Sequence, residues 1–232
     1  MFRFFVLSLS GKKKDMMQLR TYFSWIFCLI LLSIAGNGQA QEAQAILDQA
    51  AQAYEQSNGI KANFAIHSVV PQQNISESFE GVINMKGDKF KLETPDMITW
   101  YNGETQWSYM KANDEVNVSV PTPEEQQSMN PYTFVNLYKE GYHYQLKETT
   151  LRGKSCYEIT LTARNKQKSP HTIILDINKD NHSLMCIRMQ QRKKGQWTRI
   201  SIQQLHTGQS FAATDFEFNP KDYPQAEIID LR

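Results

Sequence analysis

Residues 79–110 most constrain the fold, because apolar side chains recur there at every second position between turn signals. A period of two is the pattern of a β-strand that buries one face. Asn102-Gly103 predicts a tight hairpin, since both residues tolerate a positive φ. We therefore expect short antiparallel strands that share one apolar face. The alternating residues are Phe79, Ile83, Met85, Phe90, Leu92, Thr105, Trp107 and Tyr109.

Residues 1–40 have the pattern of a secretory leader. A basic stretch precedes an apolar run over residues 22–35, and small residues follow up to Ala40. This order predicts export and cleavage after Ala40, with translation starting at Met1, Met16 or Met17. An uncleaved membrane anchor is the alternative, but the run is shorter than the ~20 residues that a spanning helix needs. We expect a signal peptide over residues 1–40 and one domain over residues 41–232.

The composition of residues 41–232 excludes some functions. Their 20 basic and 23 acidic side chains give no electrostatic footprint for nucleic acid. Two cysteines remain, Cys156 and Cys186, and the predicted turns place a whole strand between them. Non-adjacent strands lie ~9.6 Å apart, whereas a disulfide needs Cα atoms within ~7 Å. We therefore favour free thiols, although an exported protein could form a disulfide.

The rest of the chain predicts one helix, a second possible helix and further strands. Residues 42–57 have helical periodicity and end at Asn58-Gly59, a typical helix stop. Residues 121–141 hold a short apolar helix, which could be a lid over the sheet or a permanent part of the core. Strands fill most of the remainder. The expected fold is mainly β: a strongly bent antiparallel sheet, or incomplete barrel, with helices covering an apolar cavity.

No catalytic motif is present in the sequence. The histidines lack metal-ligand spacing, and there is neither a nucleophile elbow nor a phosphate-binding glycine loop. We therefore expect no enzyme, no metal and no cofactor, with an enzyme acting on a sugar or lipid through dispersed residues as an alternative. An apolar sheet face can instead hold an acyl chain, because each buried methylene contributes ~0.8 kcal/mol.

The order of these elements resembles the periplasmic outer-membrane lipoprotein carrier family, the LolA-like proteins. Residues 79–86, FEGVINMK, look like the glycine strand of that family, and residues 101–109, YNGETQWSY, look like its hairpin. Residues 215–220, DFEFNP, followed by residues 228–232, IIDLR, look like its C-terminal ending. One position departs from the pattern: Lys86-Gly87 stands where the family often has an arginine tied to lid closure, and lysine lacks the forked donor geometry of arginine.

The resemblance implies a periplasmic monomer that carries acylated lipoproteins from an inner-membrane ABC exporter to an outer-membrane acceptor. It implies no reaction and no cofactor. Two alternatives use the same fold: a lipid or lipoprotein sensor that regulates envelope stress, or a carrier of another lipid. The expected lining of the acyl cavity is Phe64, Ile83, Met85, Phe90, Leu92, Trp100, Trp107, Tyr109, Phe134, Leu137 and Ile159.

Overall fold

The computed structural model describes residues 39–71, 74–122, 125, 141–165, 167–190 and 195–232. The chain divides into two units, Met1–Gln41 and Glu42–Arg232, and the second contains the whole sheet. The short helix predicted within residues 121–141 lies almost entirely outside the described residues, so whether it is a lid or a core element stays open.

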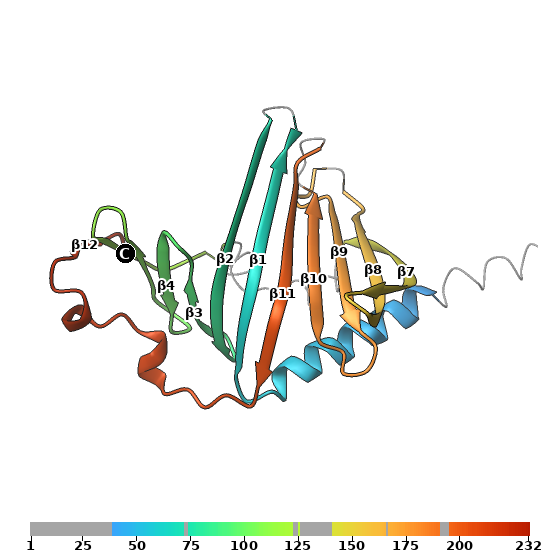
Figure 1. The fold of residues 1–232 in the computed structure, drawn as a ribbon, viewed down its shortest axis with the longest axis horizontal. Helices are drawn as coiled ribbons and strands as arrows, with labels where there is room; N and C mark the ends of the chain where they lie inside the picture. The colour runs from blue at the N-terminus through green and yellow to red at the C-terminus, as the bar shows by residue number, and fades with distance from the viewer. Residues whose placement is uncertain (1–38, 72–73, 123–124, 126–140, 166, 191–194) are drawn as a thin grey trace, which may run out of the picture. The chain divides into compact units, whose positions relative to one another are not determined.

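Twelve strands form a single open sheet in the order β12-β6-β5-β4-β3-β2-β1-β11-β10-β9-β8-β7 (Figure 1). Every neighbouring pair is antiparallel except β12, which runs parallel to β6. The prediction of a mainly-β, incomplete barrel is confirmed, and the sheet is mixed rather than purely antiparallel. The strands are β1 (Ile60–Val70), β2 (Ile75–Lys86), β3 (Lys89–Glu93), β4 (Met97–Tyr101), β5 (Gln106–Met110), β6 (Glu115–Ser119), β7 (Tyr142–Leu151), β8 (Lys154–Ala163), β9 (Thr172–Asn178), β10 (Leu184–Gln190), β11 (Trp197–Thr207) and β12 (Glu227–Asp230).

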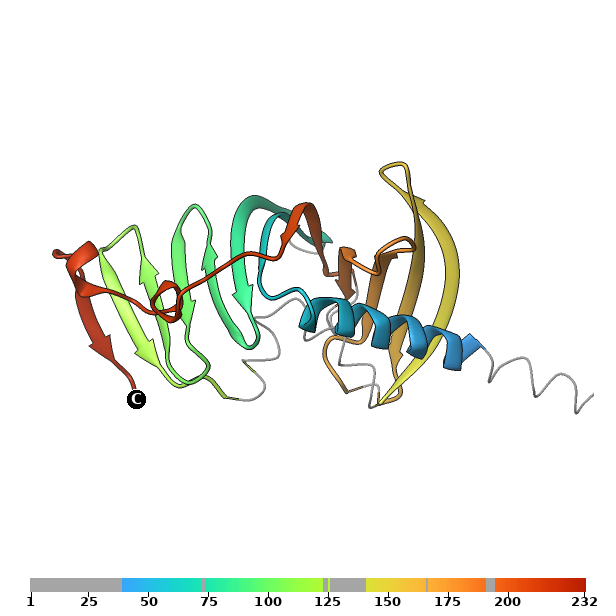
Figure 2. The same cartoon turned by 90° about the horizontal axis from the view of Figure 1, so that it is seen from below.

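In the part of the chain that the structure describes, one α-helix covers residues 39–55, and its residues from Ala43 on pack against the sheet. Its buried residues, Ala43, Ile46, Leu47 and Ala50, recur at helical spacing and belong to one core with apolar residues of β1, β2 and β7–β11. Figures 1 and 2 show this helix (blue) crossing strands β8–β10, with β7 and β8 curving round it. The helix predicted from periodicity is confirmed, with its ends shifted by two or three residues.

The hairpin between β4 and β5 forms where Asn102-Gly103 predicted it. Gly103 has a φ of 100°, a conformation that favours glycine. The side-chain oxygen of Asn102 accepts hydrogen bonds from the backbone N–H groups of Glu104 and Thr105. This turn sets the register of the two strands, so that Trp100 lies opposite Trp107. The register therefore places both tryptophans on the same face of the sheet.

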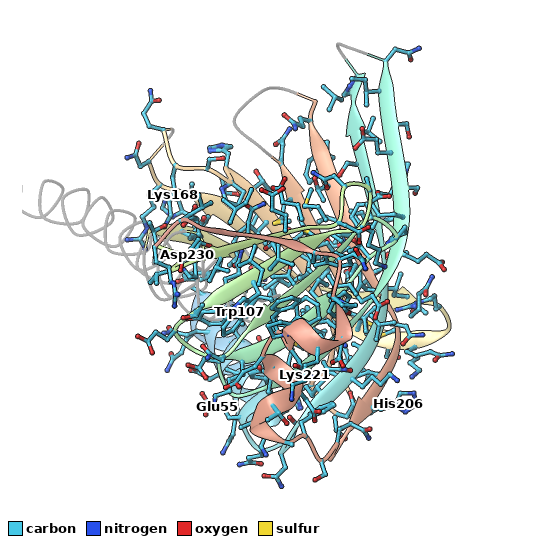
Figure 3. The ribbon with its side chains drawn as sticks, turned by 90° about the vertical axis from the view of Figure 1, so that its left-hand side faces the viewer. Glu55, Trp107, Lys168, His206, Lys221 and Asp230 are labelled. Atoms are coloured by element: carbon cyan, nitrogen blue, oxygen red, sulfur yellow. The ribbon has the colours of Figure 1, made fainter. Side chains whose placement is uncertain are left out.

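A second core lies on the sheet face opposite the helix. Ile98 and Trp100 of β4 pack there with Val116, Val118 and Phe218, and Trp107 and Tyr109 join them. The covering segment includes the 3-10 helices η4 (Ala213–Phe216) and η5 (Pro220–Asp222). Figure 3 labels Lys221 on this segment and Trp107 on β5. The prediction that residues 79–110 share one apolar face is therefore wrong, because Phe90 and Leu92 pack on the helix side.

The two cysteines are free and buried, as predicted. Cys156 lies on β8 and Cys186 on β10, and β9 separates these strands. Burial raises the pKa of both thiols. Because the thiolate is the reactive form, neither cysteine has the environment of a catalytic nucleophile.

Candidate functional site

The helix-side face of the sheet carries most of the apolar residues expected to form a cavity wall. Six of them belong to or pack against the core beneath the helix: Phe64, Ile83, Met85, Phe90, Leu92 and Ile159. Gly81 allows this arrangement, because a Cβ at that position would lie 2.5 Å from Cζ of Phe64 and 2.6 Å from the carbonyl oxygen of Glu93. The glycine in the family-like strand is thus explained by the close approach of the Phe64 ring.

The other predicted lining residues do not join this face. Trp100, Trp107 and Tyr109 lie on the opposite face, in the core covered by the C-terminal segment. Phe134 and Leu137 lie outside the described residues. The structure therefore divides the described residues of the expected lining between two faces, and those on the helix side lie together.

The helix-side core continues into a row of partly exposed apolar residues. Ile66 of β1 lies opposite Phe79 of β2 and opposite Ile200 of β11, and Met189 lies on the next strand, β10. Ile66, Met189 and Ile200 are partly buried and pack against the helix-side core, whereas Phe79 is 37% exposed. We call these four residues the open apolar row. It extends the buried face toward solvent across four adjacent strands.

A side-chain hydrogen bond connects the end of the helix to the turn between β2 and β3. The hydroxyl of Tyr54 donates to the carbonyl oxygen of Gly87 at 2.6 Å. This turn includes Lys86-Gly87, where LolA-like proteins often have an arginine. The side chain of Lys86 bonds elsewhere. Its Nζ donates to the carbonyl oxygen of Phe211 in the C-terminal segment at 3.1 Å. No local sequence signal predicted the Tyr54 contact, since it joins residues 33 positions apart.

Two pockets flank this end of the helix. One, of about 600 Å³, lies between the helix, β11 and the turn between β9 and β10, and it is lined by both apolar and basic residues. The other, of about 410 Å³, lies against the turn between β2 and β3. Tyr54 lines both pockets. Sequence reasoning missed the larger pocket because its walls come from four separate segments.

Within the described ranges, no group of three or more histidine, cysteine or carboxylate side chains is placed to hold a metal ion. The described part of the chain also contains no helix that is long and apolar enough to cross a membrane. One phenol near the site, that of Tyr101, has a raised pKa because of burial and the nearby carboxylates of Asp88 and Glu104. Its hydroxyl donates to the carbonyl oxygen of Gly103 at 2.8 Å, which supports the hairpin rather than a reaction.

An open β-sheet with an apolar, helix-covered face defines the class of LolA-like folds. The family described as "Outer membrane lipoprotein carrier protein LolA" matches residues 33–196, and the chain belongs to this family. Comparison with curated proteins finds no match.

Three solved structures are similar to this chain at low sequence identity, and the first of them has the same fold. An uncharacterized conserved protein from Thermus thermophilus has a TM-score of 0.57 and 12% identity, over 82% of this chain and 99% of that one. The lipoprotein LppX from Mycobacterium tuberculosis has a TM-score of 0.47 and 11% identity, over 75% and 98%. A LolA superfamily protein from Nitrosomonas europaea has a TM-score of 0.41 and 13% identity, over 76% and 97%.

Proposed function

We propose that the protein is a periplasmic carrier that binds the acyl chains of lipoproteins on the helix-side face and moves them from the inner to the outer membrane. The observation that carries this proposal is the open apolar row, which continues the core under the helix out to the partly exposed Phe79. Membership of the lipoprotein carrier family supports the choice of cargo. By the same likeness, the partners are an inner-membrane exporter and an outer-membrane acceptor.

The energetics of the face suit a reversible carrier. Each methylene that leaves water contributes about 0.8 kcal/mol, so contact with part of one acyl chain outweighs the cost of a small rearrangement. The hydrogen bond from Tyr54 to Gly87 contributes only about 0.5–1.5 kcal/mol. An acyl chain that enters between helix and sheet can therefore displace this end of the helix. Met85 and Met189 on the same face adapt to chains of different shape, because methionine is flexible.

Ile66→Asp is expected to weaken binding of a fluorescent fatty-acyl probe by about tenfold or more, because an acyl chain on the row would have to desolvate the new carboxylate. His67→Asp is the matched control. His67 is the next residue of the same strand, is exposed and lies on the opposite face, so its replacement should leave probe affinity unchanged. Probe titration with each purified variant measures the effect, after circular dichroism has shown that both are folded.

Two results would count against the proposal. If the folded wild-type protein binds neither the acyl probe nor an acylated lipoprotein, the carrier function is wrong. If the two aspartate variants bind the probe equally, the acyl chain lies elsewhere than on the open apolar row. Transfer of a bound lipoprotein to outer-membrane vesicles then separates a carrier from a protein that only binds lipid.

A further inference from the structure

The pocket of about 600 Å³ beside the helix has walls of two chemical kinds. One wall is apolar and includes Ile60, Leu184 and Ile202, which also belong to the helix-side core. The other wall carries the basic residues Arg152, Lys154 and His182. The pocket is therefore continuous with the face to which we assign acyl chains, and it has polar groups at one side.

The ionisable side chains that line the pocket are basic, apart from the phenol of Tyr54. No carboxylate is among its lining residues in the part of the chain that the structure describes. Neither Arg152 nor Lys154 forms a salt bridge with a described residue. The C-terminal end of the helix, which also lines the pocket, contributes only about half a negative charge. Two permanent positive charges exceed this, so the net field in the pocket favours an anion.

Arg152 is held in place by backbone contacts while part of its guanidinium stays available. It occupies the first position of the two-residue turn between β7 and β8 with a φ of 52°, where asparagine, aspartate or glycine is usual. Its Nη2 donates to the carbonyl oxygens of Ile202 at 2.6 Å and Met185 at 3.3 Å. Among the described residues, none accepts a hydrogen bond from Nε or Nη1. These remaining donors have the planar arrangement that suits a carboxylate or phosphate.

We propose that this pocket binds the anionic group of an amphiphile, a carboxylate or a phosphate, through Arg152 and Lys154, while its acyl chain lies on the adjoining apolar wall. The inference rests on the proposed acyl-binding function and narrows its cargo. With such a site, the protein would prefer lipids that carry a negative charge at one end over neutral lipids with the same acyl chain. The register of β10 shifts around Met185, and that of β11 shifts next to Ile202, so both carbonyl oxygens that hold Arg152 lie at β-bulges.

The test compares amphiphiles that differ only in charge. Oleate is paired with methyl oleate, and oleoyl lysophosphatidic acid with monooleoylglycerol; each displaces a bound fluorescent acyl probe from the purified protein. The wild-type protein should bind the anionic member of at least one pair about tenfold more tightly, and the pair that responds distinguishes carboxylate from phosphate. Lys154→Gln should remove most of this preference without changing affinity for the neutral members. Arg152→Gln should do the same.

The control is Lys221→Gln, which removes one positive charge from η5 of the C-terminal segment, at a residue that does not line the pocket. It should leave the preference intact. Lys154→Gln makes the test decisive even if Arg152→Gln fails to fold, because no hydrogen bond of the Lys154 side chain supports the turn among the described contacts. Equal affinity for charged and neutral members, or a preference that survives in Lys154→Gln, would overturn the anion site but leave the acyl-binding proposal standing. Failure of all four amphiphiles to bind would overturn both.

Discussion

Replacing Arg188 by methionine is expected to lower the free energy of unfolding by about 3 kcal/mol, the lower end of the range for breaking a buried ion pair. Arg188 of β10 lies on the sheet face away from the helix, where its Nη2 is 2.8 Å from Glu158 and 3.0 Å from Asp176. The side chain of Asp176 is only 5% exposed, so the variant would leave this carboxylate buried without its cation. The lower end applies because Arg188 itself remains 24% exposed.

Chemical denaturation of Arg188→Met and Arg199→Met measures this effect. Arg199 lies opposite Arg188 on the next strand and is exposed, which makes it a matched control expected to lose less than about 0.5 kcal/mol. Adding Asp176→Asn to Arg188→Met should recover part of the loss, since it removes the stranded charge. Equal losses in the two arginine variants would show that the cluster does not stabilise the fold.

The same variant has a defined pH dependence. Burial raises the pKa of Glu158, but hydrogen bonds from Lys147 and Arg188 outweigh burial and lower it overall. The stability that the charged Glu158 contributes is therefore present at neutral pH and is lost as the pH falls through its lowered pKa. Burial raises the pKa of Asp176 despite the nearby Arg188. Protonation of Asp176 in acid therefore removes the cost of keeping a buried carboxylate charged. Both effects should make the loss in Arg188→Met largest near neutral pH and smaller below about pH 4.

Trp100→Ala is expected to lower the free energy of unfolding by about 3–5 kcal/mol and to release the C-terminal segment from the sheet. Trp100 is 4% exposed, and its ring centroid lies 5.6 Å from those of both Phe218 and Tyr223. Removing the indole leaves a cavity and ends both edge-to-face contacts, each worth about 0.5–1.5 kcal/mol beyond the buried area. Denaturation measures the loss, and limited proteolysis followed by mass spectrometry reports cleavage within residues 209–226.

Trp197→Ala is the control for this prediction. Trp197 begins β11 and is only partly buried, so the same substitution should cost clearly less and leave the C-terminal segment resistant to protease. Similar stability losses in both variants, with no new cleavage site in Trp100→Ala, would show that Trp100 does not hold the segment. Acyl-probe binding should persist in Trp100→Ala if it stays folded, because Trp100 lies on the face opposite the proposed site.

Elements whose signals are local could be predicted from the sequence. Alternation within each strand and the Asn102-Gly103 turn identified the strands and hairpin of residues 79–110. Helical spacing and the Asn58-Gly59 stop located the helix. The number of strands between the two cysteines predicted free thiols. The motif order indicated the family, because those motifs keep their spacing along the chain.

How these elements face one another could not be predicted from the sequence, because it depends on the pairing of the strands. Alternation fixes which residues of one strand share a face, but the register between strands decides whether Phe90 and Trp100 point the same way, and here they do not. The same limit hid the contact of Tyr54 with Gly87 and the pocket around Arg152, since both join segments that are distant in sequence. The periodicity of a segment indicates which of its own residues are buried. A binding site depends instead on how several strands pair and where they bulge.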